Sequence, residues 1–360
     1  MASLTSHEVA VLFLALGLLL ATARLFAEIA KRFNQPMVLG EILAGVFWGP
    51  TIVGTLAPHL SSYLFPTQGG GALVLDGMMT LAITLFLLVA GMEVDLSTVW
   101  RQGKTAIAVS LAGIIGPFGV GFAAAWFFPQ LIGGQAGGEN ALVFALFIGT
   151  ALSISALPVI IKTLMDLNLY RSDLGMLVVA AAVFNDLVGW IVFAVILGMI
   201  GKTNQFSIGM TIFLTLAFAG GMLTIGRWLI NRSLPWIQAH SSWPGGILGF
   251  SLSLALFCAA FTEWIGIHAI FGAFIAGIAL GDSRHLRERT RATIEQFVSF
   301  IFAPLFFAGI GLKVNFVKEF DLLLVITVLV IATLGKVIGC GLAGRMSGMA
   351  RREAWALGFG

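Results

Sequence analysis

The sequence predicts an all-α, polytopic membrane protein, and its composition and the length of its apolar runs carry that prediction. Of the 360 residues, 59% are apolar and only 10% are charged, against about 25% charged residues in an ordinary soluble domain. The mean hydropathy is +1.00. The apolar residues form runs of about 20, the length of helix that crosses a bilayer. These figures exclude a soluble globular protein, a disordered chain and a nucleic-acid-binding protein, since a soluble surface of this size needs far more charge.

Eleven candidate spans follow one another along the chain. Short connections that carry turn residues, such as Asn34-Gln35-Pro36, separate them, and no soluble domain of useful size fits between any two. The apolar stretch 245–281 is too long for one crossing and just long enough for two, so we expect a break near Gly266. The expected spans are 7–26, 37–56, 74–92, 104–128, 141–165, 174–200, 209–230, 245–264, 267–281, 297–316 and 320–343.

The first span has two interpretations. Ala21-Thr22-Ala23 resembles the cleavage site of a signal peptide, but no Lys or Arg precedes the apolar run, and Arg24 follows it. Because a signal peptide carries positive charge before its apolar core, we expect a retained helix.

The distribution of basic residues sets the expected topology. With eleven spans, sixteen Lys and Arg residues fall on one side of the membrane and three on the other. Lys and Arg are enriched in cytoplasmic loops. We therefore expect the N-terminus outside and residue 360 in the cytoplasm.

Small residues recur within two of the spans. Gly45 and Gly49 form a G-x-x-x-G pair, and four glycines crowd the range 113–121. Small residues let helices approach closely in a membrane, so both regions are expected to be helix-packing faces.

Two ionisable residues lie deep in the expected spans. Asp186 is near the middle of 174–200, roughly 20 Å from the cytoplasmic end, and Lys336 is roughly 13 Å from that end of 320–343. Each such residue costs about 2.5 to 3.5 kcal/mol at a helix centre. A lysine stem spans most of the difference, so the two side chains could meet if their helices are neighbours. The pair is then either a salt bridge that locks two helices or an ion or proton site, and an intramembrane position favours the second.

The span before Asp186 bears on this choice. It contains Pro158, which removes a helix hydrogen bond, and hydroxyls at Thr150, Ser153 and Ser155. A span broken in mid-membrane frees backbone carbonyls that can bind a cation, and its half-helix ends carry partial charge. The alternative is a kinked helix whose hydroxyls bond back to the carbonyls four residues earlier. Both interpretations stay open.

Six segments occur along nearly the whole chain: QPMVLGEILAGVFWGP (35–50), LFLLVAGMEVDL (85–96), TALSISALP (150–158), FNDLVGW (184–190), GIHAIFGAFIAGIALGD (266–282) and PLFFAGIGLKV (304–314). Together and in this order they resemble the monovalent cation:proton antiporter-2 family, the bacterial sodium/proton and potassium/proton exchangers.

The resemblance implies an inverted-repeat fold of thirteen helices, in which a core domain with two crossed broken helices moves against a dimerisation domain. It implies that Asp186 is the essential ion-binding carboxylate and that Lys336 is the lysine near the site. Asn185 matches the position that is Asp in many electrogenic members and Asn in electroneutral ones. The hydroxyl residues fall on the first broken helix: Thr150, Ser153 and Ser155.

The family pattern also implies two further helices after the position of Lys336. The second broken helix would begin at EAWALGFG (353–360), so we expect residues 1–360 to be one sodium/hydrogen exchanger-type transmembrane domain that lacks the last two helices.

The expected function is secondary active antiport of Na⁺ or K⁺ against H⁺ by alternating access at Asp186, by a homodimer in the cell (inner) membrane. We expect no cofactor, no metal beyond the transported ion and no nucleic-acid partner. The alternative is a non-transporting membrane scaffold or sensor that retains the fold. An enzyme is not expected, because the sequence has no G-x-S-x-G, no H-E-x-x-H and no Cys-His cluster.

Overall fold

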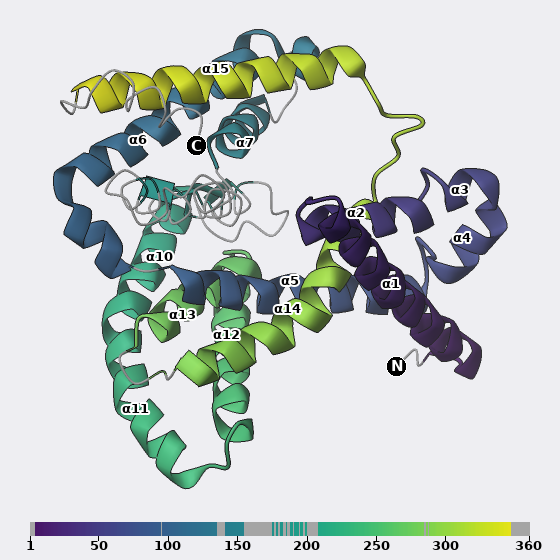
Figure 1. Ribbon diagram of the computed structural model, residues 1–360, viewed down its shortest axis with the longest axis horizontal. Helices are drawn as coiled ribbons and strands as arrows, with labels where there is room; N and C mark the ends of the chain where they lie inside the picture. Colours follow the sequence, from purple (N-terminus) through teal and green to yellow (C-terminus); the bar gives the residue numbers. More distant parts are fainter. Residues whose placement is uncertain are drawn as a thin grey trace.

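The computed structural model describes residues 4–94, 96–134, 141–154, 208–283, 286 and 288–346, with isolated residues between 175 and 199. All regular structure in these ranges is helical (Figure 1), which confirms the all-α prediction. Seven of the described helices are long and apolar enough to cross a membrane. The helices are α1 (Ser6–Arg32), α2 (Met37–Trp48), α3 (Val53–Leu56), α4 (Pro58–Leu64), α5 (Gly70–Glu93), α6 (Leu96–Phe127), the 3₁₀ turn η1 (Pro129–Ile132), α7 (Ala141–Ser153), α10 (Ile208–Gly221), the π-helical turn η2 (Met222–Gly226), α11 (Arg227–His240), α12 (Gly245–Trp264), α13 (Ala269–Gly281), α14 (Glu288–Gly311) and α15 (Leu322–Met346).

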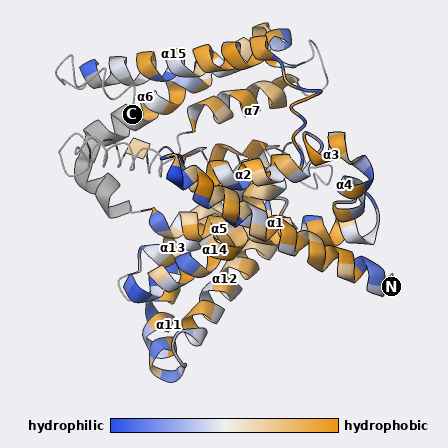
Figure 2. Cartoon of the chain, turned by 45° about the vertical axis from the view of Figure 1, so that its right-hand side comes forward, coloured by the Kyte–Doolittle hydropathy of each residue, from blue (hydrophilic) through white to orange (hydrophobic). Residues whose placement is uncertain are grey.

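Most of the expected spans coincide with these helices. The span 174–200 lies largely outside the described residues, so the count of eleven spans stays a prediction. The helices expose many large apolar side chains, such as Phe257 on α12 and Leu329 on α15. Hydrophobic residues colour much of the length of most helices in Figure 2. Such a surface is unfavourable in water and suits the hydrocarbon of a bilayer.

The helices form two groups (Figure 1). In one, α1, α2, α5, α12, α13 and α14 pack together, and in the other α6 packs against both α7 and α15. Figure 2 shows the same separation from a second direction. The two groups are joined along the chain through the α5–α6 connection and the segment between α14 and α15.

The packing repeats within the chain. The first helix pair, α1 with α2, is matched by α12 with α13. The contact of α2 with α14 is matched by that of α13 with α5, and α5 also packs on α14. The four helices α1, α2, α5 and α6 therefore correspond in order to α12, α13, α14 and α15, as in a structural repeat.

Glycine pairs make the central crossings of this repeat. A Cβ atom added at Gly45 or Gly311 would overlap backbone atoms of the opposite helix, which closes the α2–α14 crossing. The same holds for Gly91 and Gly277 at the α5–α13 crossing. Backbones that touch in this way need a residue without a side chain, so the prediction that Gly45 lies on a packing face is confirmed.

A break separates α12 from α13 where we expected one. Gly266 has φ of 79°, a left-handed conformation that a glycine adopts without strain. The next helix is capped by two side chains: the Glu263 carboxylate accepts the Ala269 N–H at 2.8 Å, and the His268 ring accepts the Ile270 N–H at 3.4 Å. Glycine ends one helix and polar groups begin the next, so the apolar stretch folds as two helices.

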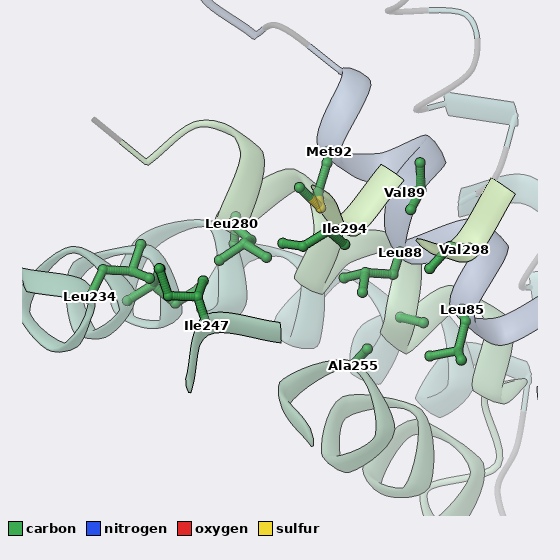
Figure 3. Close-up of a cluster of buried hydrophobic side chains, with 13 residues drawn as sticks. Leu85, Leu88, Val89, Met92, Leu234, Ile247, Ala255, Leu280, Ile294 and Val298 are labelled. Carbon is green, nitrogen blue, oxygen red and sulfur yellow. The ribbon is translucent and has the colours of Figure 1, made fainter. Parts of the chain in front are cut away.

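Five helices converge on one apolar cluster (Figure 3). Leu88 of α5, Leu234 of α11, Ile247 of α12, Leu280 of α13 and Ile294 of α14 are all almost completely buried in it. Interdigitated side chains of this kind lock their helices together, because each lost contact costs dispersion energy. The five helices are therefore held rigidly to one another at this cluster.

The helical segment that contributes Leu234 to this cluster is longer than expected. We expected a span at 209–230, but α10, η2 and α11 continue the helical path to His240. Arg227 and Asn231 interrupt the apolar run near the expected end, yet α11 is amphipathic and buries Ile230 and Leu234. Both polar residues have partners at the end of α13, Arg227 in Asp282 and Asn231 in Ser283, so they do not end the helix.

Candidate functional site

The end of α7 forms the centre of the site. This helix ends at Ser153, within the expected span 141–165, and Ile154 is no longer helical. The last carbonyls of a helix lack intrahelical partners and carry partial negative charge. Ending the helix here exposes such carbonyls inside an apolar region, where they need donors or a cation.

Asn185 supplies the first donor. Its side chain is 6% exposed, and its Nδ2 donates to the Ser153 carbonyl oxygen at 3.1 Å. A buried hydrogen bond to a freed carbonyl removes the cost of leaving that group unpaired. Asn185 therefore ties the segment that precedes Asp186 to the end of α7.

Lys336 supplies a charge at the same place. Its Nζ lies 3.5 Å from the Ile154 carbonyl oxygen, and the side chain is half-buried on α15. A cation at the C-terminal end of a helix is stabilised by the helix dipole. The distance is at the outer limit of a hydrogen bond, so the contact is mainly electrostatic.

The two described hydroxyls bond to their own helix. Thr150 and Ser153 are both almost fully buried. Thr150 Oγ1 donates to the Leu146 carbonyl at 2.8 Å, and Ser153 Oγ donates to the Thr150 carbonyl at 2.8 Å. Thr150 thus bonds back to the carbonyl four residues earlier, as in the alternative that we considered, and Ser153 bonds back to the carbonyl three residues earlier. Each hydroxyl oxygen still has acceptor lone pairs, so cation coordination by either residue stays a prediction.

Three residues that the sequence singled out lie outside the described residues, namely Ser155, Pro158 and Asp186. The expected meeting of Asp186 with Lys336 is therefore untested. Asn185, the neighbour of Asp186 in sequence, and Lys336 both reach the end of α7, from different helices. The sequence predicted that backbone carbonyls would be the cation ligands, because a broken span frees carbonyls. No residue pattern indicates which carbonyls are freed.

The segment that carries Asn185 also contacts the larger helix group. Val178 and Ala182 belong to an apolar cluster with Phe271 and Phe274 of α13 and Leu87 of α5. Asn185 faces α7 of the smaller group. The site thus lies where the two groups meet, a position at which relative movement of the groups would change access to it.

Comparisons with known proteins identify the family. A sequence model described as "Sodium/hydrogen exchanger, transmembrane" matches residues 15–360. The chain belongs to this family. Among relatives, the Na⁺/H⁺ antiporter NhaS4 of Synechocystis is 32% identical over 95% of this chain and 83% of its own length. The cation/H⁺ antiporter 18 of Arabidopsis thaliana is 30% identical over 95% of this chain, which spans only 42% of that protein.

A solved protein structure shares the fold. The sodium proton antiporter MjNhaP1 from Methanocaldococcus jannaschii superposes with a TM-score of 0.70 at 18% identity, covering 98% of this chain and 82% of that one. The expected antiporter fold is confirmed, and the family resemblance seen in the sequence is correct.

Proposed function

We propose that this chain exchanges a monovalent cation, Na⁺ or K⁺, for H⁺ across a membrane, with Asp186 as the group that binds either the proton or the cation. The observation that carries the proposal is the end of α7, where freed carbonyls are met by Asn185 and by the Lys336 ammonium. Relatives named as Na⁺/H⁺ and cation/H⁺ antiporters support it.

The chemistry follows from competition at one carboxylate. An ionised carboxylate and backbone carbonyls are hard oxygen ligands that suit a hard cation such as Na⁺. A carboxylate that holds a proton has lost the charge that binds the cation, so the two ligands exclude each other. Alternating exposure of such a site to the two sides of the membrane converts that competition into exchange.

Lys336 has a defined part in this scheme. Its ammonium lies at the Ile154 carbonyl, one of the oxygens that a cation would use. Two positive charges at the same oxygen repel each other strongly in a low dielectric. Cation binding therefore requires the ammonium to move away from this oxygen. When no cation is bound, the Lys336 ammonium takes the place of the cation and pairs with the Ile154 carbonyl at the end of α7.

The proposed stoichiometry is one H⁺ for one cation. If only Asp186 changes its protonation, the cycle moves no net charge. Asn185 cannot ionise and so adds no second proton. Loss of a proton from Lys336 during the cycle would instead make the exchange electrogenic.

The proposed setting is the cell (inner) membrane, with the N-terminus outside and residue 360 in the cytoplasm. The excess of Lys and Arg on one side of the expected spans supports this orientation. We propose a homodimer, on the family resemblance alone.

Reconstituted protein tests the function. In proteoliposomes with an imposed pH gradient, adding Na⁺ or K⁺ should dequench a pH-sensitive dye, and Asp186→Asn should abolish the response. Asp76→Asn is the matched control, because Asp76 pairs with Lys313 on an exposed surface. It lies near the start of α5, whereas Leu87, near the other end of α5, belongs to the apolar cluster that contains Ala182. A wild-type chain that never responds, or an Asp186→Asn variant as active as wild type, would overturn the proposal.

A further inference from the structure

One helix, α6, touches both helices that carry the site. It packs against α15, which holds Lys336, and against α7, which ends at the Ile154 carbonyl. The backbones of these two partners approach each other at few places, and their side chains meet in an apolar cluster that also contains Ala125 of α6. The gap between the Lys336 ammonium and its carbonyl is therefore fixed largely by how each partner sits on α6.

The crossing of α6 with α15 leaves no room for a side chain. A Cβ added at Gly335 would lie 2.9 Å from Pro117 Cα, and one added at Gly339 would lie 2.9 Å from the Ala112 carbonyl oxygen. From the other side, a Cβ at Gly116 would lie 3.0 Å from Gly339 Cα. Gly335 and Gly339 form a G-x-x-x-G pair around Lys336, so the lysine lies at the point of closest approach.

The crossing of α6 with α7 is equally close. A Cβ added at Gly149 would lie 2.9 Å from the Phe118 carbonyl oxygen, and one at Gly121 would lie 3.2 Å from Gly149 Cα. Gly149 is about one turn before Ser153, the last residue of α7. This second crossing therefore places the broken helix end.

The contact between the Lys336 ammonium and the Ile154 carbonyl is easily broken by a small movement. At 3.5 Å between Nζ and the Ile154 oxygen, a further separation of a few tenths of an ångström takes the pair beyond hydrogen-bond range. Helices that must admit a methyl group at the crossing separate by about that amount or more, because packed backbones cannot compress.

We propose that α6 is the positioning element of the ion site, and that Gly116, Gly335 and Gly339 set the reach of the Lys336 ammonium to the Ile154 carbonyl. The inference rests on the proposed function, since it assumes that this carbonyl and this lysine compete with the cation. Widening the crossing withdraws the ammonium, and the cation then meets less competition.

Cation binding to purified protein tests this without requiring transport. The concentration of Na⁺ or K⁺ that gives half of the maximal thermal stabilisation should fall by roughly threefold or more in Gly339→Ala. Gly119→Ala is the matched control on α6, because a Cβ there meets nothing within 4 Å, and it should bind like wild type. If Gly339→Ala does not fold, Gly116→Ala puts the methyl group in the same gap with a smaller overlap.

A double-mutant cycle separates positioning from general damage. Lys336→Ala should also tighten binding, and adding Gly339→Ala to it should change nothing more, because the glycine acts through the lysine. An undiminished effect of Gly339→Ala without the lysine, or wild-type binding by Gly339→Ala, would overturn the inference while leaving the proposed exchange intact. A wild-type chain that no cation stabilises would overturn both.

Discussion

Gly91 of α5 and Gly277 of α13 lie backbone to backbone where their helices cross, with a Cβ added at Gly277 only 3.0 Å from Gly91 Cα. Gly45 and Gly311 make the equivalent contact between α2 and α14. The two crossings hold the larger helix group together, and they occupy corresponding places in the repeat. Close backbone approach replaces the hydrophobic driving force that is missing between helices in lipid.

Gly91→Ala should therefore destabilise the protein. The added methyl group would overlap the Phe274 carbonyl, and overpacking of this kind typically costs about 1–3 kcal/mol. The melting temperature in detergent should fall. Gly77→Ala in the same helix meets nothing within 4 Å and should leave the melting temperature unchanged or raise it slightly. Equal melting temperatures for the two variants would show that the crossing is not close.

Asn185→Asp should make exchange sensitive to membrane potential. The present side chain donates to the Ser153 carbonyl, and an aspartate can keep that bond only when it is protonated. A second proton carried per cycle adds net charge to the transport. Capacitive currents on a solid-supported membrane should be absent for wild type and present for the variant.

Asn231→Asp is the control for that experiment. Asn231 Oδ1 accepts from the Ser283 hydroxyl at 2.6 Å, so an aspartate keeps this bond as an acceptor, and no current should appear. Currents from the wild-type chain would refute the one-for-one stoichiometry.

The ion pair between Arg227 and Asp282 should contribute to stability. Arg227 Nη1 lies 2.7 Å from Asp282 Oδ2, and the side chains are 40% and 15% exposed. Arg227→Gln should lower the free energy of unfolding by about 1 kcal/mol, since the pair is partly screened. Lys313→Gln breaks the pair with Asp76, whose side chains are 76% and 66% exposed, and should have no measurable effect. Similar melting temperatures for both variants would show that burial does not distinguish the pairs.

The sequence predicted features that depend on local chemistry. The break at Gly266 follows from a glycine between two apolar runs, and the packing role of Gly45 follows from its G-x-x-x-G spacing. The expected end of the seventh span at residue 230 was wrong, because Arg227 and Asn231 have partners at the end of α13 and the helix buries apolar residues as far as Leu234. The π-helical turn at Met222–Gly226 has no residue signature that separates it from an ordinary helix.

The site was predictable in its parts and not in its arrangement. Position along a helix follows from residue number, so Lys336 lies well inside α15, as expected. Its contact with the Ile154 carbonyl depends on which helices are neighbours and how they are rotated, and both helices concerned pack against α6. A backbone oxygen carries no side-chain identity, so no motif could have indicated it.

Proton release on cation binding tests the central claim most directly. Titrating Na⁺ or K⁺ into purified protein, in buffers of different ionisation enthalpy, counts the protons displaced for each cation bound. The account predicts about one proton released per cation in the wild-type chain, and no binding-linked release in Asp186→Asn. Cation binding without proton release, or the same release from Asp186→Asn, would contradict it.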